Sequence, residues 1–163
     1  MATTDPLPDD IRAALAAHTT LTLAYADEDG PQACAVLYAV RHSVRSGAAE
    51  RPGLLFVTAV TTRHGRALLP GETRVAFTAQ RDGQDWSELT GIQGRGVCRR
   101  LTGEDRATAW RAYSARFPYV ERTERLRQAM ERTDLWELRP DWLRLVDNGK
   151  GFGHKSEWIA PAV

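Results

Sequence analysis

The sequence predicts an α+β fold that is mainly β, built on an antiparallel sheet or barrel with flanking helices. Three observations lead to this class. About six segments alternate or run apolar over strand lengths. Two of them flank a turn sequence between residues 20 and 40, and the helical segments do not alternate regularly with strands. The 163 residues are long enough for one domain, which we expect to span residues 1–163.

The first elements follow from apolar periodicity and turn residues. "LPDDIRAALAAH" predicts a short helix with Ile11, Leu15 and His18 on one face. "TLTLAYA" and "QACAVLYAV" predict a hairpin around "DEDGP", and "RHSVRSGAAERP" predicts a polar loop. "GLLFVTAV" and "TRVAFTAQ" predict buried strands separated by a short helix in "TTRHGRALLPGE". "DWSELTGIQGRGVCRRL" predicts a long strand whose glycines mark bulges or curvature.

The second half begins with a capping-box pattern, Thr102 with Asp105, before the helix "EDRATAWRAYSAR". One face of that helix carries an aromatic stripe, which is typical of a core or dimer contact and less often of a cofactor site: Trp110, Tyr113 and Phe117. "VERTERLRQAMER" predicts a second, more charged helix. "LWELRPDWLRLVD" predicts a strand pair or one bent strand, with Pro140 at an edge or bend.

Composition excludes several classes of protein. The net charge of +1 argues against an obligate nucleic-acid binder. No apolar run reaches the roughly 18 residues of a membrane span, and "MATTDPLPDD" lacks the pattern of a signal peptide. We therefore expect a cytoplasmic protein that does not bind a membrane, with Cys34 and Cys98 both reduced. The four histidines are scattered, so no metal site is expected.

The segment "LLFVTAVTTRHGRAL" has the strongest local pattern for a binding site. A buried strand runs into Thr61, Thr62, Arg63 and His64, and a helix follows. Threonine hydroxyls and an arginine beside a helix N-terminus suit a phosphate dianion. The alternative is that Thr62 is an ordinary N-cap and that Arg63 and His64 are solvated. No catalytic acid, base or nucleophile is identified.

The glycine-dense strand "GIQGRG" contains a single amide side chain, Gln93. Glycines let a flat ring approach closely, and an amide can pair with the edge of a heterocycle. The alternative is a barrel corner that needs glycine for curvature.

The octet "GKGFGHKS" departs from the phosphate-binding loop G-x-x-x-x-G-K-[ST] at His154, where the motif has its second glycine. Such a loop must open a helix, and Pro161 lies too close behind it. The octet holds both lysines of a chain whose other basic residues are all arginine, Lys150 and Lys155.

Taken in order, "FVTAVTTRHG", "TRVAFTAQ", "GIQGRGVCRRL", "YSARFP" and "WLRLVDNGKGFGHKSEW" resemble one family over nearly the whole chain. They are similar to the pyridoxamine 5′-phosphate oxidase-like split barrels, and in particular to a bacterial branch with "TRHG", "RFP" and "DN…GFG.K..W". The resemblance implies a six-stranded antiparallel split β-barrel with flanking helices. It also implies a homodimer that binds flavin mononucleotide (FMN) at the subunit interface.

The resemblance assigns the flavin phosphate to Thr58, Thr62, Arg63 and His64, with His64 where the family often has lysine. It places about Val36 to Tyr38 along the flavin ring. The family's ring-contacting glutamine would fall near Gly91, whereas this chain has Gln93 on the same strand face. The oxidase motif "RLHDR" reads "RLVDN" here, which keeps Arg144 and Asp147 but replaces the last arginine by Asn148. Oxidation of pyridoxamine phosphate is therefore not expected.

Two functions stay open from the sequence. The first is a dimeric FMN-dependent oxidoreductase of unknown substrate and redox partner, in which residues 149–156 form a strap that brings Lys150 or Lys155 to the neighbouring subunit. The alternative to the strap is a surface loop followed by an edge strand, with Trp158 packed on the partner. The second function is a flavin-free split-barrel dimer that acts as a binding module. Haem or a deazaflavin on the same scaffold is a further alternative.

Overall fold

The computed structural model describes residues 6–43 and 51–161, and all strands in this part of the chain join one antiparallel sheet. The strands are β1 (Thr20–Asp27), β2 (Gly30–Leu37), β3 (Ala39–Ser43), β4 (Arg51–Val57), β5 (Thr73–Gln80), β6 (Thr90–Arg100), β7 (Leu135–Asp147) and β8 (Lys155–Ile159). The helices are α1 (Asp9–Ala17), α2 (Arg63–Leu68), α3 (Gly103–Arg116) and α4 (Glu124–Glu131). Short 3-10 turns are η1 (Trp86–Glu88), η2 (Pro118–Glu121) and η3 (Asn148–Lys150).

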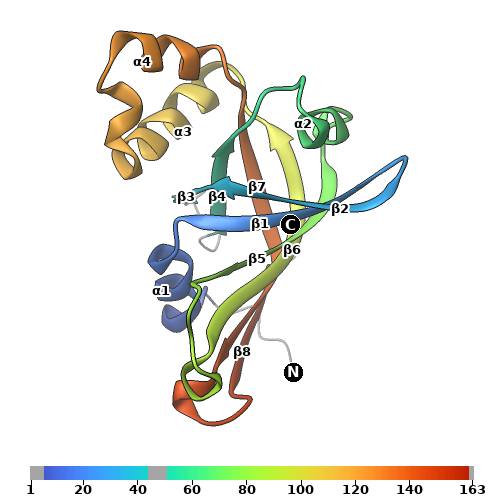
Figure 1. The fold of residues 1–163 in the computed structure, drawn as a ribbon, viewed down its shortest axis with the longest axis vertical. Helices are drawn as coiled ribbons and strands as arrows, with labels where there is room; N and C mark the ends of the chain where they lie inside the picture. Colours follow the sequence, from blue (N-terminus) through green and yellow to red (C-terminus); the bar gives the residue numbers. More distant parts are fainter. Residues whose placement is uncertain (1–5, 44–50, 162–163) are drawn as a thin grey trace.

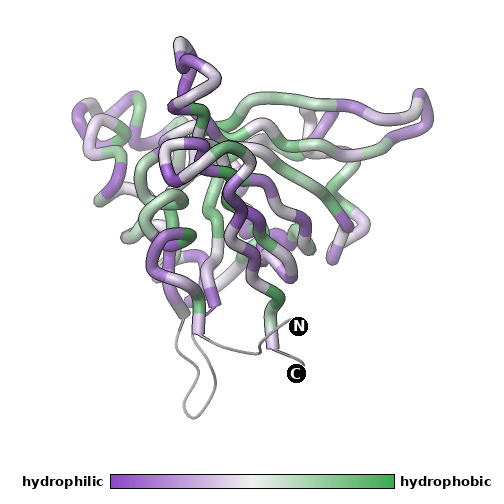
Figure 2. Tube along the Cα trace, turned by 90° about the horizontal axis from the view of Figure 1, so that it is seen from below, coloured by the Kyte–Doolittle hydropathy of each residue, from purple (hydrophilic) through white to green (hydrophobic). Residues whose placement is uncertain are grey.

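The strand order is β2-β1-β5-β6-β7-β4-β3, and β8 pairs with β7 beside this path. In Figure 1 the long strands β6 and β7 run along the molecule, α3 and α4 lie together at one end, and α1 lies beside β1 and β5. The hairpin of β1 and β2 projects sideways, and Figure 2 shows its hydrophilic tip. The expected mainly β class with flanking helices is confirmed, and the short strands β3 and β8 bring the sheet to eight strands.

The main hydrophobic core lies between helix α1 and the sheet. Strand β1 contributes Leu21, Leu23 and Tyr25 at alternate positions, as the period of a half-buried strand requires. Helix α1 covers this core with Ile11 and Leu15, which are both fully buried. Burying one such side chain contributes about 1.5–3 kcal/mol, so α1 is held mainly by its apolar face.

A bulge bends β6 and β7 where the pairing register shifts between Arg95 and Gly96. Gly96 faces Pro140, and a Cβ atom on Gly96 would lie 2.0 Å from the carbonyl oxygen of Arg139. A Cβ on Gly94 would lie 2.5 Å from the Phe77 ring. Gly94 and Gly96 of the "GIQGRG" strand are therefore required by packing within the chain, and β7 is one bent strand with Pro140 at the bend.

A second core cluster lies between α3 and strand β4. The aromatic stripe of α3 belongs to it, with the Tyr113 and Phe117 ring centroids 5.0 Å apart and Trp110 stacked on Tyr113 at 5.8 Å. Tyr113 and Phe117 are buried, so the stripe is part of the core of this chain.

The capping box at the start of α3 is not formed, because Thr102 makes no side-chain cap hydrogen bond. The Asp105 carboxylate instead accepts hydrogen bonds from Arg41 at 2.8 Å and from Arg99 at 2.7 Å. Both guanidinium groups also donate to the buried Glu137, at 2.6 and 2.9 Å. This ionic cluster ties α3 to β3, β6 and β7, and the competing guanidinium groups explain why Asp105 does not cap its own helix.

Two sequence-based expectations need correction. The predicted polar loop at residues 41–52 is wrong at its ends, since Arg41 to Ser43 belong to β3 and Arg51 and Pro52 to β4; residues 44–50 lie outside the described part. The alternative to the strap, with Trp158 packed on a partner subunit, is also wrong in its placement of Trp158. Trp158 is 3% exposed within this chain, because β8 turns its side chain into the main core.

The "GKGFGHKS" octet forms the turn between β7 and β8. Asn148 organises it: its amide group donates to the Trp86 carbonyl at 2.6 Å and accepts from the Gly153 amide at 2.9 Å. The turn holds Phe152 edge-on to Trp86, with 6.0 Å between ring centroids. No helix in the described residues is long and apolar enough to cross a membrane.

Candidate functional site

The predicted phosphate segment, residues 58–64, connects the buried strand β4 to α2. The Thr58 backbone is fixed by two bonds: its carbonyl accepts from the Trp136 indole at 3.0 Å, and its amide donates to the Asp134 carbonyl at 3.1 Å. The Asp134 carboxylate accepts from the Val60 amide at 3.1 Å. The end of β4 is thus anchored before the chain turns into the helix.

Three side chains of this segment form one hydrogen-bonded chain. The Thr62 hydroxyl donates to the Ala59 carbonyl at 2.8 Å and accepts from the Gly65 amide at 3.0 Å. Thr58 Oγ1 lies 3.0 Å from Thr62 Oγ1 and 2.6 Å from His64 Nε2. The predicted N-cap role of Thr62 is therefore present, and the sequence placed Thr58, Thr62 and His64 together correctly.

The direction of this chain follows from its proton count. Thr62 uses its only proton on Ala59, so Thr58 must donate to Thr62, and His64 Nε2 must then donate to Thr58. Burial lowers the pKa of His64 and so favours the neutral imidazole, whose Nε2–H tautomer can donate this hydrogen bond. The two hydroxyl protons and the Nε2 proton are all directed at protein atoms.

Arg63 points away from this chain, toward the tip of the β1–β2 hairpin. Its Nε donates to Asp27 at 2.7 Å, and its terminal nitrogen donates to Asp29. Asp27 is fixed in turn, because its other oxygen accepts from the Asp29 amide and from Gln32. The hydrogen bond from Arg63 is the main cause that lowers the pKa of Asp27. The Arg63 side chain is still 49% exposed.

Gly65 has a packing role, since a Cβ there would lie 2.1 Å from the Ala59 carbonyl oxygen. Arg66 is exposed and donates to the Thr61 carbonyl at 2.5 Å. Its backbone amide donates to the Thr62 carbonyl at 2.9 Å, but its side chain makes no hydrogen bond to Thr58, Thr62 or His64, and so Arg66→Ala is a useful control for Arg63.

Gln93 lies away from residues 58–64. It sits on the outer face of the sheet, across from Thr78 on β5 and Arg144 on β7. There it lines an open cavity of about 330 Å³ together with Arg95 and Trp142, and no residue of the 58–64 segment takes part.

Lys150 is also separate from the predicted phosphate residues. Its Nζ lies 3.5 Å from the Asp10 carboxylate and 3.9 Å from that of Asp147. In Figure 1 the turn after β7 and helix α2 lie at opposite ends of the long axis. Lys150 cannot reach residues 58–64 of its own chain.

No local sequence pattern indicates the acidic partners of this site. Asp27 and Asp29 lie in the predicted turn "DEDGP", and they bind Arg63 from more than 30 positions away. Asp134 and Trp136 support Thr58 from β7 and the residues just before it. Such contacts depend on tertiary structure, which local spacing does not encode.

Comparison with known proteins places the chain in a family. UPF0306 protein YhbP from Escherichia coli O157:H7 is 32% identical over 110 residues, which cover 68% of this chain and 69% of that protein. The chain belongs to the UPF0306 family. A UPF0306 protein from Klebsiella pneumoniae (strain 342) is 35% identical to this UPF0306 chain over 98 residues, 60% of each chain. No protein-family model matches the sequence.

Solved structures establish the fold of this UPF0306 chain. A heme binding protein from Mycobacterium smegmatis superposes with a TM-score of 0.62 and 23% identity, over 92% of this chain and 56% of that chain. This chain therefore spans little more than half of that protein. The FAD binding protein from Mycobacterium smegmatis gives a TM-score of 0.59 and 16% identity, over 95% and 98% of the two chains.

A putative pyridoxamine 5′-phosphate oxidase from Listeria innocua gives a TM-score of 0.58 and 13% identity, over 84% of this chain and 95% of that chain. These likenesses confirm the expected pyridoxamine 5′-phosphate oxidase-like split barrel for the UPF0306 chain.

Proposed function

We propose that this protein is a homodimeric flavin-binding oxidoreductase that takes up FMN through residues 58–64. The observation that carries the proposal is the half-exposed guanidinium of Arg63, a residue that lies between Thr62 and His64 in the segment after a buried strand. A guanidinium suits a phosphate monoester, because it keeps its charge and offers paired N–H donors. The Arg63 side chain therefore fits the flavin phosphate in kind.

In this proposal the residues have different tasks. Arg63 is the direct phosphate ligand, and it exchanges Asp27 and Asp29 for the phosphate when FMN binds. Thr58, Thr62 and His64 hold the segment in place and give the phosphate a polar wall. The bound flavin would supply hydride or electron transfer.

The second subunit is part of the proposal, because Lys150 lies too far from residues 58–64 of its own chain. Lys150 of a partner, and Gln93 on the open sheet face, would complete the flavin site in a dimer. Sedimentation of the protein at micromolar concentration checks this point. A stable monomer would contradict the shared site.

The phosphate assignment is tested by titration calorimetry with FMN and riboflavin. Removing the charge-assisted contact in Arg63→Ala should weaken FMN binding roughly ten- to a hundredfold. Riboflavin lacks the phosphate, so its binding should barely change. Asp27→Asn should tighten FMN binding, because it frees Arg63 from one competing carboxylate.

Arg66→Ala is the matched control and should behave like the unmodified protein. Equal losses in Arg63→Ala and Arg66→Ala would show that the phosphate is held elsewhere. If the unmodified protein binds neither flavin, the flavin proposal fails. A haem titration then separates the haem alternative, which the name of the Mycobacterium smegmatis heme binding protein suggests, from the flavin-free binding module.

A further inference from the structure

Strands β1 and β5 separate before their ends and leave a gap in the sheet beside α1. Their pairing covers only Thr22 with Thr78, Leu23 with Phe77 and Ala24 with Ala76. The next pairs in this register would be Leu21 with Ala79 and Thr20 with Gln80, and neither is formed. On their far sides β1 is paired with β2 and β5 with β6. The main-chain groups that face the gap therefore have no strand partner there.

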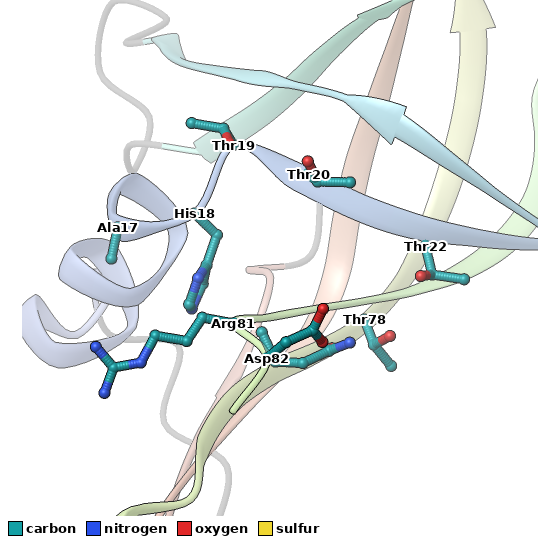
Figure 3. A pocket seen from close by; sticks show the side chains of 9 residues that line it. Ala17, His18, Thr19, Thr20, Thr22, Thr78, Arg81 and Asp82 are labelled. Atoms are coloured by element: carbon teal, nitrogen blue, oxygen red, sulfur yellow. The ribbon is translucent and has the colours of Figure 1, made fainter. Parts of the chain in front are cut away.

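The gap is a cavity of about 460 Å³ with polar walls. This volume lies within the range of small-molecule sites. Figure 3 shows threonine side chains along both strands and His18 at the end of α1, above the loop that carries Arg81 and Asp82. The residues that matter most for recognition are His18, Thr20, Thr22, Thr78, Gln80 and Arg81. No aromatic carbocycle lines the cavity, so it offers no stacking surface for a nucleobase or flavin.

Two of these side chains carry basic groups that bind no other group among the described residues. Within the described part of the chain, the guanidinium of Arg81 and the imidazole of His18 make no hydrogen bond or ion pair. Burial, helped by the charge of Arg81, lowers the pKa of His18 and favours a neutral ring that can donate and accept. The cavity thus presents one unpaired cation, one neutral imidazole, several hydroxyl groups and the Asp82 carboxylate, which can accept hydrogen bonds from ligand hydroxyl groups.

A neighbouring cavity of about 520 Å³ shares Ala17, His18 and Arg81 with the gap and continues along α1 to Lys150. The Lys150 ammonium is already paired with Asp10 and Asp147. Arg81 is therefore the cation available to an anionic ligand at this place.

We propose that the gap between β1 and β5 binds a small phosphorylated polyol or sugar. The phosphate would pair with Arg81, since a guanidinium binds phosphate through two parallel hydrogen bonds. The ligand's hydroxyl groups would exchange hydrogen bonds with His18, the threonines and the unpaired main-chain groups. This site is independent of the proposed flavin site, because none of residues 58–64 lines it.

Ribose 5-phosphate, ribose and inorganic phosphate serve as probes in titration calorimetry or nuclear magnetic resonance titration. Ribose 5-phosphate should bind more tightly than either of the other two, which each lack one half of the ligand. Arg81→Ala should weaken its binding about tenfold or more, as expected for the loss of one charge-assisted contact. Arg81→Lys should keep part of the affinity, because it keeps the charge but not the planar fork.

Arg125→Ala on α4 is the matched control, since Arg125 is also exposed and makes no ion pair or hydrogen bond among the described residues. Unchanged binding in this control supports the site. Equal losses in the Arg81 and Arg125 variants would overturn it, as would absence of ribose 5-phosphate binding at millimolar concentration. Equal binding of inorganic phosphate and ribose 5-phosphate would overturn the polyol assignment.

Discussion

The ionic cluster of Glu137, Asp105 and two arginines, Arg41 and Arg99, predicts a large loss of stability for Glu137→Gln. The Glu137 side chain is 2% exposed and accepts from Arg41 Nε at 2.6 Å and Arg99 Nε at 2.9 Å, with Arg139 Nε at 3.5 Å. The amide of glutamine would direct an N–H group at one of these guanidinium groups and remove the negative charge. Breaking a buried pair in this way costs about 3–5 kcal/mol, because the largely buried Arg41 guanidinium loses the charge of its buried partner.

For a chain of 163 residues, each kcal/mol moves the thermal midpoint by about 2–4 °C. The variant should therefore unfold about 6–20 °C below the unmodified protein, as measured by circular dichroism. Glu157→Gln is the control, since Glu157 is 45% exposed and its pair with Arg144 is screened by solvent. Equal midpoints for the two variants would refute the assignment of the cluster as a main contributor to stability.

Two further predictions concern the bulge and the half-buried histidines His18 and His64. Gly96→Ala should cost about 1–3 kcal/mol in urea unfolding, because its Cβ would lie 2.0 Å from the Arg139 carbonyl oxygen, whereas Gly149→Ala should cost little. The free energy of unfolding should fall as the pH drops below about 6.5, because the pKa values of His18 and His64 are lowered in the folded state and the unfolded chain then binds more protons. Thermal midpoints measured between pH 5 and pH 8 check this. If the midpoint changes with pH in the His18→Gln and His64→Gln variants as steeply as in the unmodified protein, the prediction is contradicted.

Local patterns predicted most of the elements, because their residues bury one face at the period of a helix or a strand. The hairpin of β1 and β2, the helix α2 and the bent strand β7 all follow from such patterns. Prediction failed where a distant group decides the outcome. Asp105 has the spacing of a capping residue, yet its carboxylate accepts hydrogen bonds from Arg41 of β3 and Arg99 of β6.

The candidate site shows the same division. Thr58, Thr62 and His64 are close in sequence, and the structure joins them by hydrogen bonds. The carboxylates that hold Arg63 come from a hairpin more than 30 positions earlier, and no local pattern indicates them. The roles of Arg63, Gln93 and Lys150 in binding remain predictions.

Strand β7 has a consequence for how the protein is made. It pairs with β6, β4 and β8, so it joins strands formed early in the chain to the last one. Until residues 135–147 have been synthesised, β4 and β6 each lack the neighbour that covers one edge. Exposed edges can pair with other chains, and charged side chains reduce this risk. Strand β6 carries three such charges, at Arg95, Arg99 and Arg100. These arginines would reduce pairing of the exposed β6 edge with other chains until β7 has been synthesised.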